Sequence, residues 1–341
     1  MNDTQPPLQS PADRAFELIT GFRASQLLRA AVELRIPDLI AGGSNSVDQL
    51  ATDTAVDSDR LRRALRGLVA LGVIEESSNG NFANTKVGDL FRERATGLAR
   101  TSLMVLDGYR AWEHCLESMR TGRTGQSIAF GEEHWQTIAR EPDQANRFNQ
   151  AMAAQTEQAS GFVVSNLDFT NSSVVVDLGG GTGALAAGIL DAHPHLRGIL
   201  CDLRAGLVGA LEYLALRGLS DRCAVVEADF FDRVPSGGDV YLLKQVIHDW
   251  DDERAVRILT NCHAVMVPAT RIVLIERLLP PRMLADPKHL GLAMLDLEMM
   301  VRLGGRERTL NEYRGLLEEA GFLFQRMVPG DRFNLIEAVV D

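Results

Sequence analysis

The C-terminal half of the chain alternates apolar runs with amphipathic segments. Runs rich in β-branched residues are expected to be strands, and segments whose apolar residues recur every three or four positions are expected to be helices. Strands are expected at 174–178, 198–203, 223–228, 239–246, 271–277, 322–329 and 334–340, with helices at 184–192, 205–216, 251–266 and 310–320. This alternation predicts a doubly wound, mostly parallel α/β domain. The tight loop at 329–331 predicts a terminal antiparallel hairpin.

The N-terminal part shows helical patterns followed by a short hairpin pattern. Helices are expected over 13–40, 46–53 and 57–71, and short strands at 73–74 and 81–85. Pro37 is expected to break the first stretch, whose apolar stripe includes Phe16 and Ile19. Together these elements form a mostly helical winged-helix domain, a fold that serves either DNA binding or packing between proteins.

A winged-helix DNA-binding regulator would need a basic surface. The third helix carries Arg60, Arg62, Arg63 and Arg66, but acidic residues surround them and the tip of the hairpin has no basic residue. The basic stripe that usually marks a DNA-binding face is therefore missing. We expect this domain to serve packing or dimerisation, and we expect the protein to be a homodimer.

Between these two parts the chain is expected to be helical around one loop. Helices are predicted over 100–119 and 143–166, a Gly-rich loop at 121–133, and a Met-rich helix at 290–303. The resulting division is a disordered tail at 1–14, a winged-helix dimerisation domain at 15–100, a helical linker that contributes to the substrate pocket at 101–166, and a ligand-binding domain at 167–341.

The composition argues against several classes of protein. A net charge of −11 over 341 residues disfavours nonspecific binding to nucleic acid or to an anionic membrane. The four cysteines lie far apart, so neither a disulfide framework nor a zinc knuckle is expected. No apolar run approaches the roughly 18 residues of a membrane-spanning helix, and the polar N-terminus lacks the pattern of a signal peptide. A cytoplasmic protein is expected.

A Gly-rich turn follows the first strand of the α/β domain. Asp177 ends this strand, and Gly179, Gly180, Gly181 and Gly183 come directly after it. Glycines at this place allow a sharp turn and a close approach of a ligand to the backbone.

Acidic residues also end the next two strands, on the same side of the sheet. Asp202 lies where a carboxylate can accept both hydroxyls of a ribose. Asp229 and Phe230 pair an acid with an aromatic ring, which suits the amino group and the face of an adenine. Three acids at successive strand ends, without a Lys or Arg cluster for phosphates, indicate an adenosine ligand.

These motifs resemble those of the S-adenosylmethionine-dependent small-molecule O-methyltransferases of the caffeic-acid and hydroxyindole type. Bacterial members of that family tailor aromatic polyketides and phenazines. The resemblance rests on the Gly-rich motif, on Cys-Asp-Leu at 201–203, Ala-Asp-Phe-Phe at 228–231, Leu-Lys-Gln-Val-Ile-His-Asp-Trp at 243–250 and Gly-Gly-Arg-Glu-Arg-Thr at 304–309. It covers nearly the whole chain, because that family also begins with a winged-helix dimerisation domain.

The resemblance implies a Rossmann-like class I methyltransferase domain that binds S-adenosyl-L-methionine and releases S-adenosyl-L-homocysteine. The residues that it implies for the cofactor are Asp177, Gly179, Gly180, Gly181, Gly183, Asp202, Leu203, Asp229, Phe230, Lys244 and Trp250.

His248 is the candidate catalytic residue. A phenol, with a pKa of about 10 by analogy with tyrosine, must lose its proton to become a good nucleophile, and an imidazole suits that task. The resemblance implies that His248 is the general base and that Glu276 and Glu307 hold it. Asp249, together with the acids at 251–253, could be read as a metal cluster, but acids also stabilise the start of a helix, and no metal is expected.

The substrate pocket is expected beside the Met-rich helix. Thioethers pack well against flat rings, and helix 143–166 leads directly to the ligand site. The expected pocket residues are Phe148, Met152, Met294, Met299 and Met300.

The sequence therefore predicts an enzyme that methylates a hydroxyl, expected to be phenolic, of a small aromatic natural product in secondary metabolism such as antibiotic biosynthesis. One alternative is an enzyme of the same fold that uses the bound cofactor for a non-methylating step such as hydroxylation. The other is the winged-helix regulator considered above.

Overall fold

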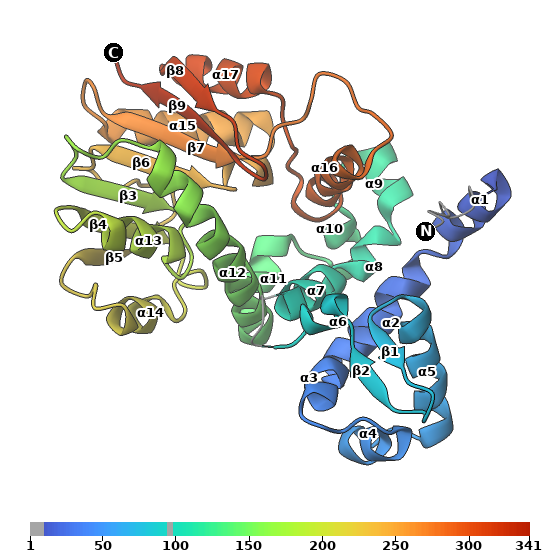
Figure 1. Ribbon diagram of the computed structural model, residues 1–341. Coiled ribbons are helices and arrows are strands. Elements are labelled where there is room, and N and C mark those ends of the chain that lie inside the picture. The colour runs from blue at the N-terminus through green and yellow to red at the C-terminus, as the bar shows by residue number, and fades with distance from the viewer. Residues whose placement is uncertain (1–9, 94–97) are drawn as a thin grey trace, which may run out of the picture. The chain divides into compact units, whose positions relative to one another are not determined.

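The computed structural model describes residues 10–93 and 98–341, which fall into two compact units, Met1–Asp107 and Gly108–Asp341 (Figure 1). Of the predicted tail at 1–14, residues 1–9 lie outside the described residues. Helix α1 (Pro11–Thr20) begins within the remainder of that range. It can begin there because the Ser10 side chain accepts a hydrogen bond from the Asp13 amide at 3.1 Å and Pro11 suits a first turn.

The N-terminal unit contains the predicted helices and hairpin. Its elements are α1, α2 (Phe22–Glu33), α3 (Ile36–Ala41), α4 (Val47–Thr54), α5 (Ser58–Ala70), β1 (Ile74–Glu76), β2 (Phe82–Asn84), α6 (Lys86–Asp89) and α7 (Leu98–Asp107). Ser46 and Gln49 form a capping box that starts α4. Leu50, Leu61 and Leu65 are almost fully buried in the core of this unit.

Two details of this unit differ from the expectation. The helical stretch divides at Arg35, whose φ is 57°, and Pro37 lies in the first turn of α3, where its missing N–H costs nothing. The apolar stripe does not continue into the core, because Phe16 and Ile19 are 62% and 71% exposed. The arginines at 60, 62, 63 and 66 are exposed along α5.

The C-terminal unit is built on a seven-stranded sheet in the order β5-β4-β3-β6-β7-β9-β8. Its strands are β3 (Val174–Leu178), β4 (Arg197–Asp202), β5 (Cys223–Glu227), β6 (Val240–Lys244), β7 (Arg271–Glu276), β8 (Leu323–Val328) and β9 (Asn334–Val339). The first five strands run parallel, whereas β9 is antiparallel to both β7 and β8. The predicted parallel sheet and its terminal hairpin are thus confirmed.

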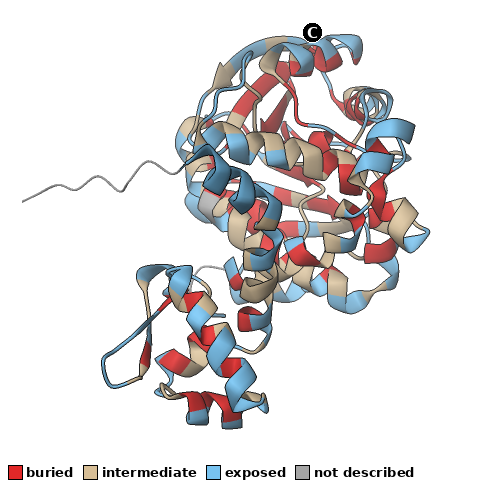
Figure 2. Cartoon of the chain, turned by 90° about the vertical axis from the view of Figure 1, so that its right-hand side faces the viewer, coloured by how far each residue is buried: buried red, intermediate tan, exposed pale blue. Residues whose placement is uncertain are grey.

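Helices cover both faces of this sheet because neighbouring strand residues point to opposite sides. Val176 packs in one core with residues of α15 (Asp252–Val265) and α17 (Leu310–Glu319). Val175 packs in the other core with residues of α12 (Pro142–Asn166), α13 (Ala184–Ala192) and α14 (Ala210–Leu216). The strands between these layers are largely buried (Figure 2).

The segment before α12 is more helical than predicted. It contains α8 (Tyr109–Trp112), α9 (Cys115–Thr121), α10 (Gly125–Phe130) and α11 (His134–Arg140). Two glycines of the predicted loop instead end helices in a left-handed conformation: Gly122 after α9, with a φ of 73°, and Gly131 after α10, with a φ of 80°. The Met-rich helix is α16 (Pro287–Glu298), which continues as a π-helical segment, η2 (Met299–Leu303).

Within the described ranges, the structure has no helix that is long and apolar enough to cross a membrane.

Candidate functional site

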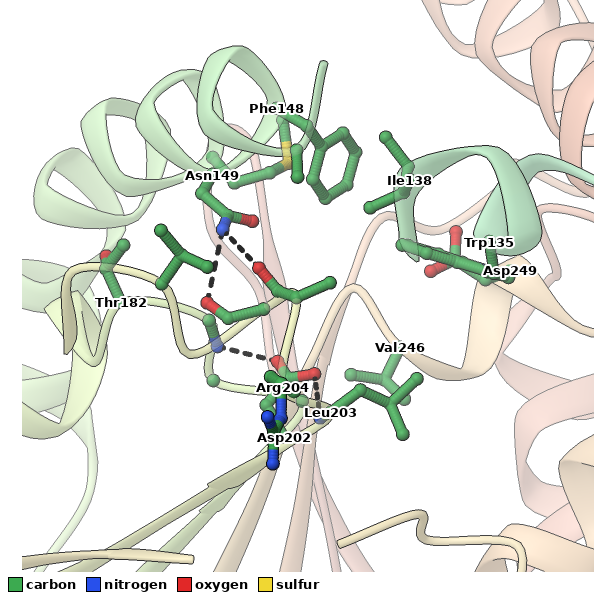
Figure 3. A pocket seen from close by; sticks show the side chains of 18 of the residues that line it. Trp135, Ile138, Phe148, Asn149, Thr182, Asp202, Leu203, Arg204, Val246 and Asp249 are labelled. Atoms are coloured by element: carbon green, nitrogen blue, oxygen red, sulfur yellow. Dashed lines mark hydrogen bonds between the residues drawn. The ribbon is translucent and has the colours of Figure 1, made fainter. Parts of the chain in front are cut away.

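A cavity of about 770 Å³ opens at the carboxyl ends of the parallel strands (Figure 3). Residues that follow β3, β4, β5 and β6 form its floor, and residues of α11 and α12 form the opposite wall. The strand order changes direction at β3, which lies between β4 and β6. Ligands of open α/β sheets bind at such a switch point.

The Gly-rich turn contributes three of its four glycines to this cavity. Gly179, Gly180 and Gly181 line it, and a Cβ on Gly180 would lie 2.5 Å from Leu200 Cδ1. Gly183 does not line the cavity; its left-handed conformation, with φ 85°, starts α13. The turn therefore needs glycine both for ligand approach and for its own folding.

The carboxylate of Asp177 lines the cavity but is tied to the fold. Its Oδ2 accepts a hydrogen bond from the Ala186 amide in the first turn of α13 at 3.2 Å, and the residue is 1% exposed. Burial raises the pKa of Asp177 to about 7.

Asp202 fastens the Gly-rich turn to the end of β4. Its Oδ2 accepts from the Gly181 amide at 2.8 Å and its Oδ1 from the Leu203 amide at 2.7 Å (Figure 3). Burial raises the pKa of this carboxyl, and the two amide hydrogen bonds oppose that shift. Asp229 similarly accepts from the Phe231 amide at 2.8 Å.

Asn149 is a cavity residue that the sequence analysis missed. From α12 its amide nitrogen donates to the Ala205 carbonyl at 2.8 Å and to the Gly206 carbonyl at 3.3 Å (Figure 3). These bonds hold the loop after β4 against α12. A lone polar residue on a helix carries no sequence signal for such a contact.

Aromatic side chains form one wall of the cavity. Trp250 lies against Phe231, with ring centres 4.7 Å apart, and stacks with Trp135 at 6.4 Å and an interplanar angle of 27°. Trp135 also meets Phe148 edge-on at 5.5 Å. Trp135 was missed because no element was predicted between the loop at 121–133 and the helix at 143–166. The capping pair Glu133 and Gln136 is the signal that could have revealed α11.

His248 lies beside the cavity in the 3₁₀ turn η1 (Ile247–Asp249) and is 5% exposed. Its Nδ1 is 2.7 Å from Glu307 Oε1, and its Nε2 is 3.3 Å from Asp249 Oδ1. Glu276 contacts the turn differently, since its Oε1 accepts from the Ile247 amide at 3.0 Å. Glu307 therefore holds the imidazole directly, and Glu276 holds the backbone beside it.

Charge and burial compete at His248. Burial lowers the pKa of the imidazole, but Asp249, Glu276 and Glu307 outweigh it and raise that pKa to about 10. Burial raises the pKa values of Asp249 and Glu276 to about 7. Asp249 lines the cavity, and His248 precedes it in the same turn without being one of the lining residues.

The expected pocket residues fall into two groups. Phe148 and Met152 line the cavity. Met294, Met299 and Met300 are not among the residues that line it. Met294 is 45% exposed on α16, and Met299 is buried at the start of the π-helical segment.

Every other residue expected to bind the cofactor lines the cavity: Leu203, Phe230, Lys244 and Trp250, besides Asp177, Asp202 and Asp229. Within the part of the chain that the structure describes, no group of three or more His, Cys, Asp or Glu residues is arranged to hold a metal ion.

Comparison with known proteins matches both units to family models of O-methyltransferases. The family model of the O-methyltransferase domain matches residues 112–323, and that of the O-methyltransferase dimerisation domain matches residues 16–94. The phenazine O-methyltransferase PhzM of Lysobacter antibioticus is 35% identical over 325 residues, which cover 94% of either protein.

Two solved structures share the fold over nearly their whole length. The mitomycin 7-O-methyltransferase MmcR has a TM-score of 0.91 at 33% identity, covering 97% of this chain and 98% of that one. NcsB1, an O-methyltransferase from neocarzinostatin biosynthesis solved with S-adenosylmethionine and 2-hydroxy-5-methyl naphthoic acid, has a TM-score of 0.83 at 29% identity, covering 93% and 96%.

Proposed function

Because the chain belongs to the O-methyltransferase family, we propose that it transfers the methyl group of S-adenosyl-L-methionine to a phenolic hydroxyl of an aromatic natural product. The observation that carries the proposal is the cavity at the ends of β3 and β4, with Asp202 at its floor and an aromatic wall beside His248. S-Adenosyl-L-homocysteine is the second product. The match to a dimerisation domain supports a homodimer.

The residues of the cavity suit this cofactor. Each oxygen of Asp202 accepts one amide hydrogen bond, which leaves lone pairs for ribose hydroxyls. A Cβ on Gly181 would meet no atom within 4 Å, so the turn leaves open space where a ligand can approach the backbone. Asp229 and Phe230 offer an acceptor and a ring face to adenine. The cofactor supplies a methyl group on a good leaving group; the chain supplies binding, alignment and a base.

In this proposal His248 removes the proton of the acceptor hydroxyl. Glu307 at 2.7 Å fixes the ring orientation and stabilises the imidazolium that forms. The raised pKa means that the imidazole is largely protonated at neutral pH when the cavity holds no cation. A positively charged ligand in the cavity favours the neutral imidazole by repulsion, so the base becomes available when such a ligand is bound.

The first test of the proposal is the mass of the product. Wild-type protein is incubated with S-adenosylmethionine and a panel of hydroxynaphthoates and hydroxyphenazines. The acceptor is expected to gain the mass of one methylene, and the matched methyl ethers are expected not to react. A product that gains one oxygen instead would indicate the hydroxylating alternative. If the purified protein retained NAD and not adenosylhomocysteine, that result would contradict S-adenosylmethionine as the cofactor.

Asp202→Asn is expected to weaken the binding of S-adenosylhomocysteine by about 10- to 100-fold, since one hydrogen bond to a charged group contributes about 1.5–3 kcal/mol. Isothermal titration calorimetry measures the change. Asp191→Asn, in the exposed ion pair with Arg217, is the matched control and should bind like the wild type. Equal affinity of Asp202→Asn and the wild type would exclude the ribose contact.

A further inference from the structure

Gln245 has a backbone conformation that glutamine rarely adopts. Its φ is 51°, and among the described residues that line the cavity it is the one residue other than glycine with a positive φ. A left-handed conformation costs free energy for any residue with a Cβ, and glycine avoids that cost. Strain of this kind persists where the surrounding structure enforces it, and it concentrates at functional sites.

The turn at Gln245 brings His248 to the site. The Gln245 amide donates to the Ile275 carbonyl at 3.1 Å, which extends the pairing of β6 with β7 by one bond. The chain then enters η1, where the Ile247 amide donates to Glu276. A glycine could make this turn at lower cost, so the turn alone does not account for a glutamine.

The side chain of Gln245 has a specific partner. Lys244 Nζ donates to its Oε1 at 3.0 Å. An ammonium only donates, so the atom that faces it must be the amide oxygen, and the amide NH₂ remains as a further donor.

Lys244 lines the cavity without a direct ion pair to a described residue. Within the described residues no carboxylate forms an ion pair with it, and Nζ lies 5.0 Å from the centre of the Phe333 ring, which Arg277 also faces at 5.3 Å. Burial lowers the pKa of Lys244 to about 8, and the carboxylates of Glu276, Asp177 and Asp249 oppose that shift. None of them forms an ion pair with Lys244, and the side chain lines the cavity, so a bound anion can contact the ammonium directly.

The order of the strands indicates which part of the ligand this anion belongs to. Asp202 and Asp229 follow β4 and β5 on one side of β3, whereas Lys244 ends β6 on the other side. A ligand whose adenosine lies over β4 and β5 places its amino-acid end over β3 and β6.

We propose that Gln245 is a positioning residue that holds the Lys244 ammonium at the cavity, where this cation binds the carboxylate at the amino-acid end of the methyl donor. The proposal rests on the proposed function. It explains why a strained glutamine stands where a glycine would fold more easily.

The test compares two ligands and two variants of the full-length protein. S-Adenosylhomocysteine carries the carboxylate, and 5′-methylthioadenosine has the same adenosine and sulfur without it. Gln245→Gly is expected to bind adenosylhomocysteine about tenfold more weakly and methylthioadenosine as the wild type does, both measured by calorimetry. Its thermal unfolding midpoint should be equal to or above that of the wild type, because the strain is relieved.

Ala269→Gly is the matched control. Ala269, in the turn before β7, also has a positive φ, 69°, and does not line the cavity. The unfolding midpoint of Ala269→Gly should likewise be equal to or above that of the wild type. Its affinity for both ligands should be unaltered. Gln245→Glu keeps an oxygen for Lys244 but adds a negative charge, and it should discriminate against adenosylhomocysteine still more strongly.

Three results would overturn the proposal. In the first, Gln245→Gly binds adenosylhomocysteine as tightly as the wild type. In the second, it loses affinity for both ligands equally. In the third, its loss of affinity comes with a lowered unfolding midpoint, which would indicate a merely structural role. Failure of the wild type to bind either ligand would instead contradict the proposed function itself.

Discussion

His248→Ala is expected to lower kcat by about 10²- to 10⁴-fold, the range over which a positioned general base accelerates a reaction. The physical reason is the acidity of the acceptor, because a phenol is a weak nucleophile at neutral pH until it loses its proton. His248 does not line the cavity, so the affinity for adenosylhomocysteine should stay within about twofold of the wild type. Steady-state kinetics and calorimetry measure the two effects separately.

His263→Ala is the matched control for this substitution. His263 lies on α15, where its ring packs against Phe322 at 5.1 Å, and it is not part of the cavity. Its loss should leave kcat unchanged. Turnover by His248→Ala close to that of the wild type at neutral pH would exclude His248 as the base.

Glu307→Gln is expected to change the pH dependence of the reaction as well as its rate. The base must be neutral to accept a proton, so the rate rises with pH through the pKa of His248. Burial lowers that pKa, and Asp249, Glu276 and Glu307 raise it above its ordinary value of 6.5. Removing the Glu307 charge therefore moves the rising limb to lower pH. The plateau rate should fall by about 10-fold or more, because the imidazolium loses its partner at 2.7 Å.

The measurement is the profile of kcat against pH at saturating cofactor, with Glu276→Gln as the comparison. Glu276 accepts a hydrogen bond from the Ile247 amide and does not bond to the His248 ring. Glu276→Gln should therefore disturb the placement of η1 and lower the unfolding midpoint of the protein. A rising limb in Glu307→Gln that coincides with that of the wild type would show that Glu307 does not set the pKa of His248.

Much of the C-terminal unit could be predicted because its signals are local. The run of Val174, Val175 and Val176 is apolar at each position because α-helices cover both faces of β3. The acids Asp202 and Asp229 lie at strand ends, and the carboxyl ends of parallel strands meet at one edge of the sheet. Periodicity and spacing are therefore enough to predict that the two acids lie close together.

The features that were missed depend on contacts between distant residues. His248 and Glu307 are 59 positions apart, and no spacing rule predicts that Glu307 reaches the ring whereas Glu276 reaches the backbone. The two indoles of the cavity wall, Trp135 and Trp250, come from segments that only the folded chain brings together. The helix that carries Met294 becomes π-helical from Met299 to Leu303, and an α-helical periodicity does not predict that change.

The role of His248 is tested most directly by comparing two acceptors that differ in the acidity of their hydroxyl. An accepted phenol and its nitro-substituted analogue are assayed with wild-type protein and with His248→Ala, at a pH where the nitrophenol is already ionised. His248→Ala should lose about 10²- to 10⁴-fold in rate on the ordinary phenol and retain most of its rate on the ionised one, because that acceptor has no proton to remove. An equal loss on both acceptors would contradict proton removal by His248.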